Sequence, residues 1–162
     1  MPILNVQFNA EEQKDEQGNI VTPPPGIALV MRGPCIQATV TVAQSIAEQL
    51  LQQGKPVPDP ISGLALIDTG ATSTCVDDAA AQQLQLPVVD VVEIASATHA
   101  STQQNVYPIR IALVGTPLTI DAPRADGAAL AAQGLLLLIG RDVLSSCTLF
   151  YNGSTGQITL SL

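Results

Sequence analysis

Residues 36–42 alternate strictly between apolar and polar side chains, in the order Ile-Gln-Ala-Thr-Val-Thr-Val. This period of two puts all four apolar side chains on one face, which is the pattern of a half-buried β-strand. The same alternation returns over 105–114, while 135–139 is apolar throughout, as in a strand buried on both faces. Such segments are short and are separated by turn residues, among them 12 Gly and 12 Pro. The chain is therefore expected to be mostly β.

Two or three short helices are expected beside these strands. Residues 43–54 carry apolar side chains at helical spacing, and a proline-rich connector follows, so we predict a helical insertion over about 43–61. Further short helices are expected over 77–84 and 141–146, and further strands over 27–31, 64–67, 88–95 and 117–120. A polar loop over 96–104 is expected to join two strands, and 125–132 is expected to be a weak helix or a loop. The chain should end in a hairpin of 149–151 with 157–162.

The length of 162 residues fits one domain. Hydrophobic residues make up 46% of the chain and charged residues 12%, so there is enough apolar material for a folded core. The polar segment before the proline run at 23–25 lacks this character. We expect an N-terminal arm over 1–26 and a single domain over 27–162.

The charge balance argues against two classes of partner. Six Lys and Arg residues stand against 14 Asp and Glu, which gives a net charge of -8 and disfavours nucleic acid and anionic membranes. The most apolar run is far too short to cross a bilayer, and no secretory signal is visible, so we expect a cytoplasmic protein. Three cysteines without a paired spacing predict neither a disulfide framework nor a zinc site.

The segment with the clearest chemical meaning is Asp68-Thr69-Gly70, which directly follows the apolar strand 64–67. A carboxylate in a tight turn at a strand end can accept hydrogen bonds from nearby backbone N–H groups, because glycine allows close approach. Alone, the triplet is a weak signal, since Asp and Gly are common in turns.

A second motif strengthens the first. Leu66-Ile67-Asp68-Thr69-Gly70-Ala71-Thr72, a hairpin-sized segment, and then Leu-Leu-Ile-Gly-Arg-Asp-Val-Leu at 137–144 resemble the retropepsin-like (retroviral-type) aspartic proteases and their bacterial relatives. The resemblance covers residues 63–162. It implies an all-β, acid-protease fold, in which each monomer is a closed β-barrel with short helices.

The resemblance also implies a function. A single Asp-Thr-Gly per chain implies a homodimer whose two Asp68 carboxylates share one active site and hydrolyse peptide bonds of an extended peptide or protein substrate, without metal or cofactor. Thr69 would bond across the two-fold axis, and Gly70 and Ala71 would offer backbone groups to the substrate. The C-terminal strand would contribute to the dimer contact.

Two further elements follow from the resemblance. Arg141 would support the active-site turn through a buried ion pair, for which the sequence leaves Asp77, Asp78 and Asp142 open as partners. The tip of the hairpin would act as a flap over the substrate, with Ala97, Thr98 and His99 as candidate contacts. This tip departs from the family pattern because it contains no glycine.

Three alternatives remain open on the sequence. The chain could be a non-catalytic peptide-binding or dimerisation module that keeps the protease fold. It could be an adaptor whose helix at 43–54 docks into a partner's groove. A Cys75–His99 pair could supply a cysteine nucleophile, although no cysteine-protease signature surrounds Cys75.

Overall fold

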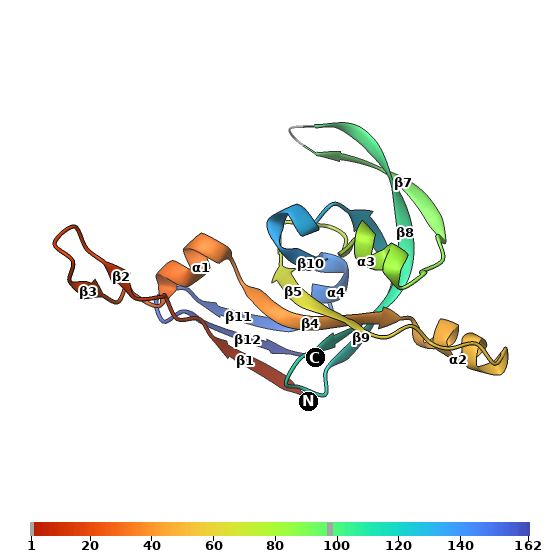
Figure 1. Ribbon diagram of the computed structural model, residues 1–162, viewed down its shortest axis with the longest axis horizontal. Helices are drawn as coiled ribbons and strands as arrows, with labels where there is room; N and C mark the ends of the chain where they lie inside the picture. Colours follow the sequence, from red (N-terminus) through yellow and green to blue (C-terminus); the bar gives the residue numbers. More distant parts are fainter. Residues whose placement is uncertain (1, 97–98) are drawn as a thin grey trace.

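The computed structural model describes residues 2–96 and 99–162, and its main element is a seven-stranded sheet that closes on itself. The strands are β4 (Cys35–Val42), β5 (Ile61–Ile67), β6 (Cys75–Asp77), β7 (Asp90–Ser96), β8 (His99–Leu113), β9 (Thr119–Ala128) and β10 (Leu135–Ile139). Their order is β4-β5-β10-β6-β9-β8-β7, and β4 also pairs with β8. Six strands therefore form a closed barrel, which confirms the predicted fold class, while β7 extends outward from β8 (Figure 1).

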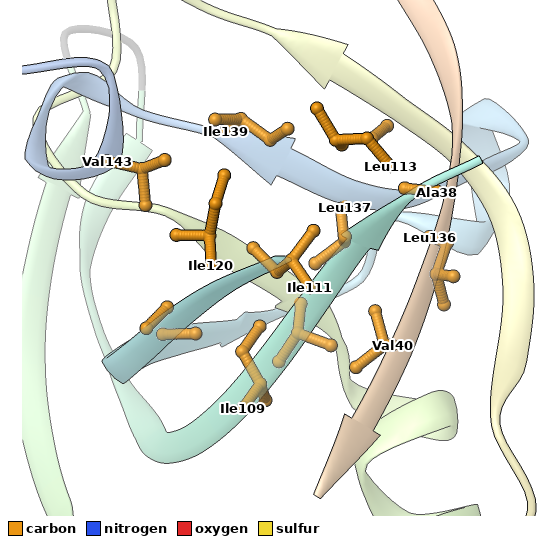
Figure 2. Packing of buried hydrophobic residues seen from close by; sticks show 14 of the residues in the cluster. Ala38, Val40, Ile109, Ile111, Leu113, Ile120, Leu136, Leu137, Ile139 and Val143 are labelled. Atoms are coloured by element: carbon orange, nitrogen blue, oxygen red, sulfur yellow. The ribbon is translucent and has the colours of Figure 1, made fainter. Parts of the chain in front are cut away.

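The barrel interior is filled by the apolar faces that the sequence pattern predicts. In β4 the four alternating apolar residues are each at most 3% exposed, and β10 contributes Leu137 and Ile139, both 0% exposed. Side chains from β4, β8, β9 and β10 meet in this core together with Val143 (Figure 2). The buried run 135–139 is central because β10 pairs with β5 on one side and β6 on the other.

Strand β8 changes its inward-facing positions partway along. Val106 is 0% exposed and so is Ile109, although these residues differ by an odd number of positions. The pairing of β8 with β9 shifts register between Tyr107 and Ile109, at Pro108, whose nitrogen cannot donate to a ladder. The resulting irregularity lets both halves of the strand face the core.

A second sheet packs beside the barrel. It consists of β1 (Ile3–Gln7), β12 (Gln157–Ser161) and β11 (Thr148–Asn152), in that order. The C-terminal hairpin is therefore confirmed. The segment expected as an N-terminal arm divides into strand β1, which pairs with β12, and a projecting hairpin of β2 (Gln13–Lys14) and β3 (Ile20–Val21) (Figure 1).

The described chain contains four α-helices, one more than the upper end of the expectation. They are α1 (Gly26–Arg32), α2 (Gln44–Gln52), α3 (Asp78–Gln83) and α4 (Arg141–Leu144), with a 3-10 helix η1 (Ala131–Gln133). The extra helix is α1, where a strand over 27–31 was predicted wrongly. Pro25 suits a helix start, and Gly26 and Leu29, three positions apart, are buried while Val30 and Met31 are exposed, so the segment buries one face of a helix.

Helix α2 confirms the helix expected from the spacing over 43–54, and it projects from one end of the barrel (Figure 1). Among the residues that the structure describes, no helix is long and apolar enough to cross a membrane.

Two loop predictions are wrong. Most of the polar segment 96–104 lies in β8, and β7 and β8 pair as far as Ser96 and His99, so the two strands form a long hairpin. This hairpin rises away from the barrel (Figure 1), and its backbone groups bond to each other across the pair. Residues 125–128 belong to β9, where the small side chain of Ala125 is packed in the core with 0% exposure.

Candidate active site

The Asp68 turn begins where β5 ends. The Asp68 N–H donates to the Ile139 carbonyl at 3.0 Å, which continues the ladder between β5 and β10. The Asp68 carboxylate then accepts the Gly70 N–H at 2.8 Å, and the Asp68 carbonyl accepts the Ala71 N–H at 3.3 Å. Asp68 is half-buried, while Thr69 and Gly70 are exposed. The turn therefore holds a carboxylate in a defined orientation at the surface of the protomer.

Arg141 braces this turn from α4. One guanidinium nitrogen, Nη1, donates to the carbonyls of Thr69 at 3.0 Å and Gly70 at 2.9 Å, and Nη2 donates to the Thr72 hydroxyl at 3.0 Å. The expected buried ion pair with a carboxylate is wrong, because Arg141 is exposed in the protomer and its described partners are all neutral oxygens. The planar fork suits this set of acceptors around one turn.

Two of the carboxylates considered as partners of Arg141 have other contacts. Asp77 is 6% exposed, and its carboxylate accepts the backbone N–H groups of Leu130, Ala131 and Ala80, which fixes the start of α3. Asp142 bonds Thr74 instead. Apart from the bond to Ala80, these contacts join residues far apart in the chain, which sequence spacing alone does not reveal.

Thr74 links the Asp68 turn to the start of α4. Its hydroxyl donates to Asp142 Oδ1 at 2.8 Å and accepts the Gly140 N–H at 3.1 Å, while its N–H donates to Asp142 Oδ2 at 3.0 Å. Thr74 is 0% exposed, so these bonds satisfy every polar atom of a buried side chain. The two sequence motifs thus form one hydrogen-bonded unit.

Gly140 lets the two motifs approach this closely. A Cβ atom at this position would lie 2.4 Å from the Ser73 carbonyl oxygen and 2.9 Å from the Thr74 nitrogen. Backbone atoms cannot move aside as a flexible side chain does, so the position requires glycine. Gly140 belongs to the second sequence motif, whereas the only sequence signal for Thr74 is its place shortly after the Asp-Thr-Gly turn.

A cleft of about 800 Å³ lies between the segment after Asp68, β7 and β9. It is lined by the turn and the residues after it (Gly70, Ala71, Thr72, Ser73 and Cys75), by β7 (Val92 and Glu93), by β9 (Arg124 and Asp126) and by Asp142. Asp126 carries no sequence motif that would identify it as a site residue, and it reaches the cleft because β9 pairs with β6.

Two ionisable groups in the cleft are shifted towards their neutral forms. Burial raises the pKa of the Asp126 carboxyl, with a further rise from nearby Asp142, against lowering effects of the Ser73 hydroxyl and Arg124. Burial, with the nearby carboxylates of Asp126, Asp142 and Asp68, raises the pKa of the Cys75 thiol to about 11. A nucleophilic cysteine needs the opposite shift, which disfavours the Cys75 alternative.

The flap candidates are only partly described. Ala97 and Thr98 lie outside the described residues. His99 begins β8 and pairs in register with Ser96, while its side chain lies outside what the structure describes. Among the described residues, no three His, Cys, Asp or Glu side chains gather in an arrangement that could hold a metal ion.

Comparisons with known proteins give two structural similarities. A retropepsin-like aspartic protease from Rickettsia conorii superposes with a TM-score of 0.47 and 10% identity, over 99% of this chain and 92% of that one. A foamy viral protease-reverse transcriptase in complex with an RNA/DNA hybrid gives a TM-score of 0.43 and 16% identity, over 69% of this chain. This chain corresponds to only 12% of the viral polypeptide's length.

No protein-family model matches the sequence, and no curated protein matches it.

Proposed function

We propose that this chain is an aspartic endopeptidase that hydrolyses peptide bonds as a homodimer, with one Asp68 from each protomer. The observation that carries the proposal is the Asp68 turn: a carboxylate is fixed by the Gly70 N–H at 2.8 Å and braced by Arg141, and Gly70 and Ala71 of the same turn line a cleft of about 800 Å³. A positioned carboxylate next to a cleft is what general acid–base hydrolysis requires.

The proposed homodimer is supported by the exposed residues of the Asp68 turn, Thr69 and Gly70. A single carboxylate cannot serve as both acid and base in one step, and the sequence offers no second Asp-Thr-Gly. Within the described part of the chain, the Thr69 hydroxyl forms no hydrogen bond, and Thr69 is exposed. A two-fold related turn would give this hydroxyl a partner and bring the second carboxylate alongside the first.

The proposed reaction uses the two carboxylates with one shared proton. Two close carboxylates cannot both ionise without strong repulsion, so the pair holds one proton between them. The ionised Asp68 takes a proton from water as the water oxygen attacks the scissile carbonyl carbon, and the protonated Asp68 gives its proton to the carbonyl oxygen. The tetrahedral intermediate then collapses and the C–N bond breaks. The amine nitrogen takes a proton from one Asp68, and a hydroxyl of the intermediate returns a proton to the other Asp68 as the new carbonyl forms, so the pair again holds one proton.

Gly70 and Ala71 can bind the substrate backbone in fewer ways than the resemblance implies. Their N–H groups are used within the turn, and their carbonyls each accept one bond from Arg141. A carbonyl oxygen has a second lone pair. We therefore propose that these residues accept hydrogen bonds from the substrate backbone and do not donate to it.

The test is cleavage of a diverse peptide library by the wild-type protein and by Asp68→Asn, at mildly acidic and neutral pH. The wild-type protein should cleave peptides, and pepstatin-type inhibitors should reduce its cleavage rate. The cleavage rate of Asp68→Asn should be at least about 1000-fold lower than that of wild type. Asp59→Asn, an equal charge change on the proline-rich connector, is the matched control and should cleave like wild type.

Sedimentation of the same samples tests the shared site. A dimer at micromolar concentration is expected. Equal turnover by Asp68→Asn would rule out the aspartic mechanism, and a folded dimer that binds peptides without cutting them would favour the non-catalytic module. Turnover by a strict monomer would rule out a site built from two chains.

A further inference from the structure

Asp126 is the least exposed charged residue of the cleft, at 7% relative exposure. On β9 it follows Ala125, which faces the barrel core with 0% exposure, so the Asp126 side chain leaves the strand on the opposite side. Its N–H donates to the Thr74 carbonyl at 2.9 Å, and β9 pairs Asp126 with Cys75 of β6. This pairing places the carboxylate beside the Asp68 turn.

Asp126 has a cation near it but no ion pair. Arg124, the one cation among the described residues that line the cleft, attracts the Asp126 carboxylate and forms its ion pair with Asp90, from Nη2 to Oδ2 at 2.6 Å. Asp142, a second carboxylate, is held by hydrogen bonds from Thr74 and Val143. Among the described ion pairs none includes Asp126, whose carboxylate is bonded by the Ser73 hydroxyl.

A buried carboxylate of this kind has already lost most of its hydration in the folded protein. A cation that enters the cleft therefore gains the attraction while only its own desolvation opposes it. Val92 of β7 also lines the cleft and offers an apolar wall. A Lys or Arg side chain matches both features, because its methylene stem packs on apolar surface while its charged end reaches a carboxylate.

We propose that Asp126 is a specificity-determining residue that selects peptides with a Lys or Arg side chain in the part of the cleft beside it. This inference rests on the proposed function, because it assumes that the cleft holds an extended peptide. Side chains of an extended peptide point alternately to opposite sides, so one residue near the scissile bond would reach Asp126.

The experiment uses peptides in which a reduced amide replaces the scissile bond, so that binding is measured without cleavage. Lys, Arg, norleucine and Glu are placed in turn at each position, and affinity for the full-length protein is measured by calorimetry. At one position wild type should bind Lys or Arg at least about tenfold more tightly than norleucine, and Glu more weakly than norleucine.

Two variants separate a local contact from net charge. Asp126→Asn should reduce the Lys-to-norleucine ratio to within about twofold of unity. Asp121→Asn changes the same charge on the same strand, where Asp121 pairs with Arg110 at 2.9 Å outside the cleft lining, and should keep the ratio. A ratio that falls equally in both variants would show that net charge causes the preference and would overturn the inference.

The result also separates this inference from the proposed function. If wild type shows no preference for a cation at any position, or if Asp126→Asn keeps the preference, the inference fails while cleavage can stand. Selective binding without any cleavage of the matching amide peptides would overturn only the proposed activity. Peptides that neither bind nor are cut would overturn both.

Discussion

Thr74 and Asp142 form a two-point contact, in which the threonine N–H and hydroxyl donate to the two carboxylate oxygens at 3.0 and 2.8 Å. The contact joins residues 68 positions apart and ties the Asp68 turn to α4. Because the Thr74 hydroxyl also accepts the Gly140 N–H, this one side chain connects the segment after the Asp68 turn to both Gly140 and Asp142. The rigidity of the candidate active site is therefore expected to depend on Thr74.

Thr74→Val should destabilise the protein by about 1–3 kcal/mol, because it leaves the buried Gly140 N–H without its acceptor and removes one of the hydrogen bonds to Asp142. Urea unfolding followed by circular dichroism measures the change. Thr39→Val removes a hydroxyl that bonds Ser62 on an exposed face at 3.1 Å, and should cost less than about 0.5 kcal/mol. Equal costs for the two variants would contradict the role of Thr74.

Gly140→Ala should lower the free energy of unfolding by about 1–3 kcal/mol, because the added Cβ would overlap the backbone of residues 73 and 74. It should also reduce peptide cleavage, since the overlap displaces the segment that follows Asp68. Gly153→Ala serves as the comparison, because its Cβ would meet only Tyr151 at 3.4 Å. A stable, fully active Gly140→Ala protein would contradict the close approach.

Arg141→Lys should reduce kcat/KM for a cleaved peptide by about tenfold with little loss of stability. A lysine ammonium cannot reach the carbonyls of Thr69 and Gly70 and the Thr72 hydroxyl with the same fixed geometry. Steady-state kinetics together with thermal unfolding measure the two effects. Arg32→Lys, at an exposed pair with Glu11, should change neither, and a similar fall in rate there would indicate a general charge effect.

Asp126→Asn should make the protein more stable than wild type at neutral pH. Because burial raises the pKa of Asp126, the folded chain holds this proton more tightly than the unfolded chain. Wild type therefore loses stability as pH rises from about 4, the ordinary pKa of Asp, through the raised value, and Asn avoids this loss. Unfolding free energies at several pH values should converge below about pH 4.

The effect of pH on stability is expected to have the opposite sign at Asp90, because the hydrogen bond with Arg124 lowers the pKa of the Asp90 carboxyl. The stabilising contribution of Asp90 is present above the ordinary Asp pKa and is lost as pH falls through the lowered value. Asp90→Asn should therefore be no more stable than wild type at neutral pH. If Asp126→Asn is less stable than wild type at neutral pH, then burial of the Asp126 carboxylate does not destabilise the protein as argued above.

Cys75 should react slowly with iodoacetamide at pH 8, at least about tenfold more slowly than a free thiol, because its pKa is raised to about 11. Mass spectrometry of the Cys75 peptide after timed alkylation measures the rate. In urea the same cysteine should react like a free thiol, since unfolding removes both the burial and the nearby carboxylates. Fast alkylation of the folded protein would show that the thiolate is more accessible than the cleft suggests.

Several features could be predicted from the sequence because their signals are local. The alternation over 36–42 determined which face of β4 is buried, and the unbroken apolar run 135–139 determined that β10 is central. The helical spacing at 43–54 identified α2. The apolar strand before Asp68 likewise predicted a carboxylate at a strand end. In each case the periodicity or turn chemistry lies within a few neighbouring residues.

Only the tertiary structure decided which carboxylate does what. Asp77, Asp142 and Asp126 look alike in sequence, but the first caps α3, the second holds Thr74 and the third lines the cleft. Arg141 likewise bonds carbonyls of the turn in place of the expected carboxylate. These roles depend on strand pairings between distant segments, such as β6 with β9, and on the burial that the pairings create. No local pattern carries that information, because a carboxylate's chemistry is set by the groups that the fold brings around it.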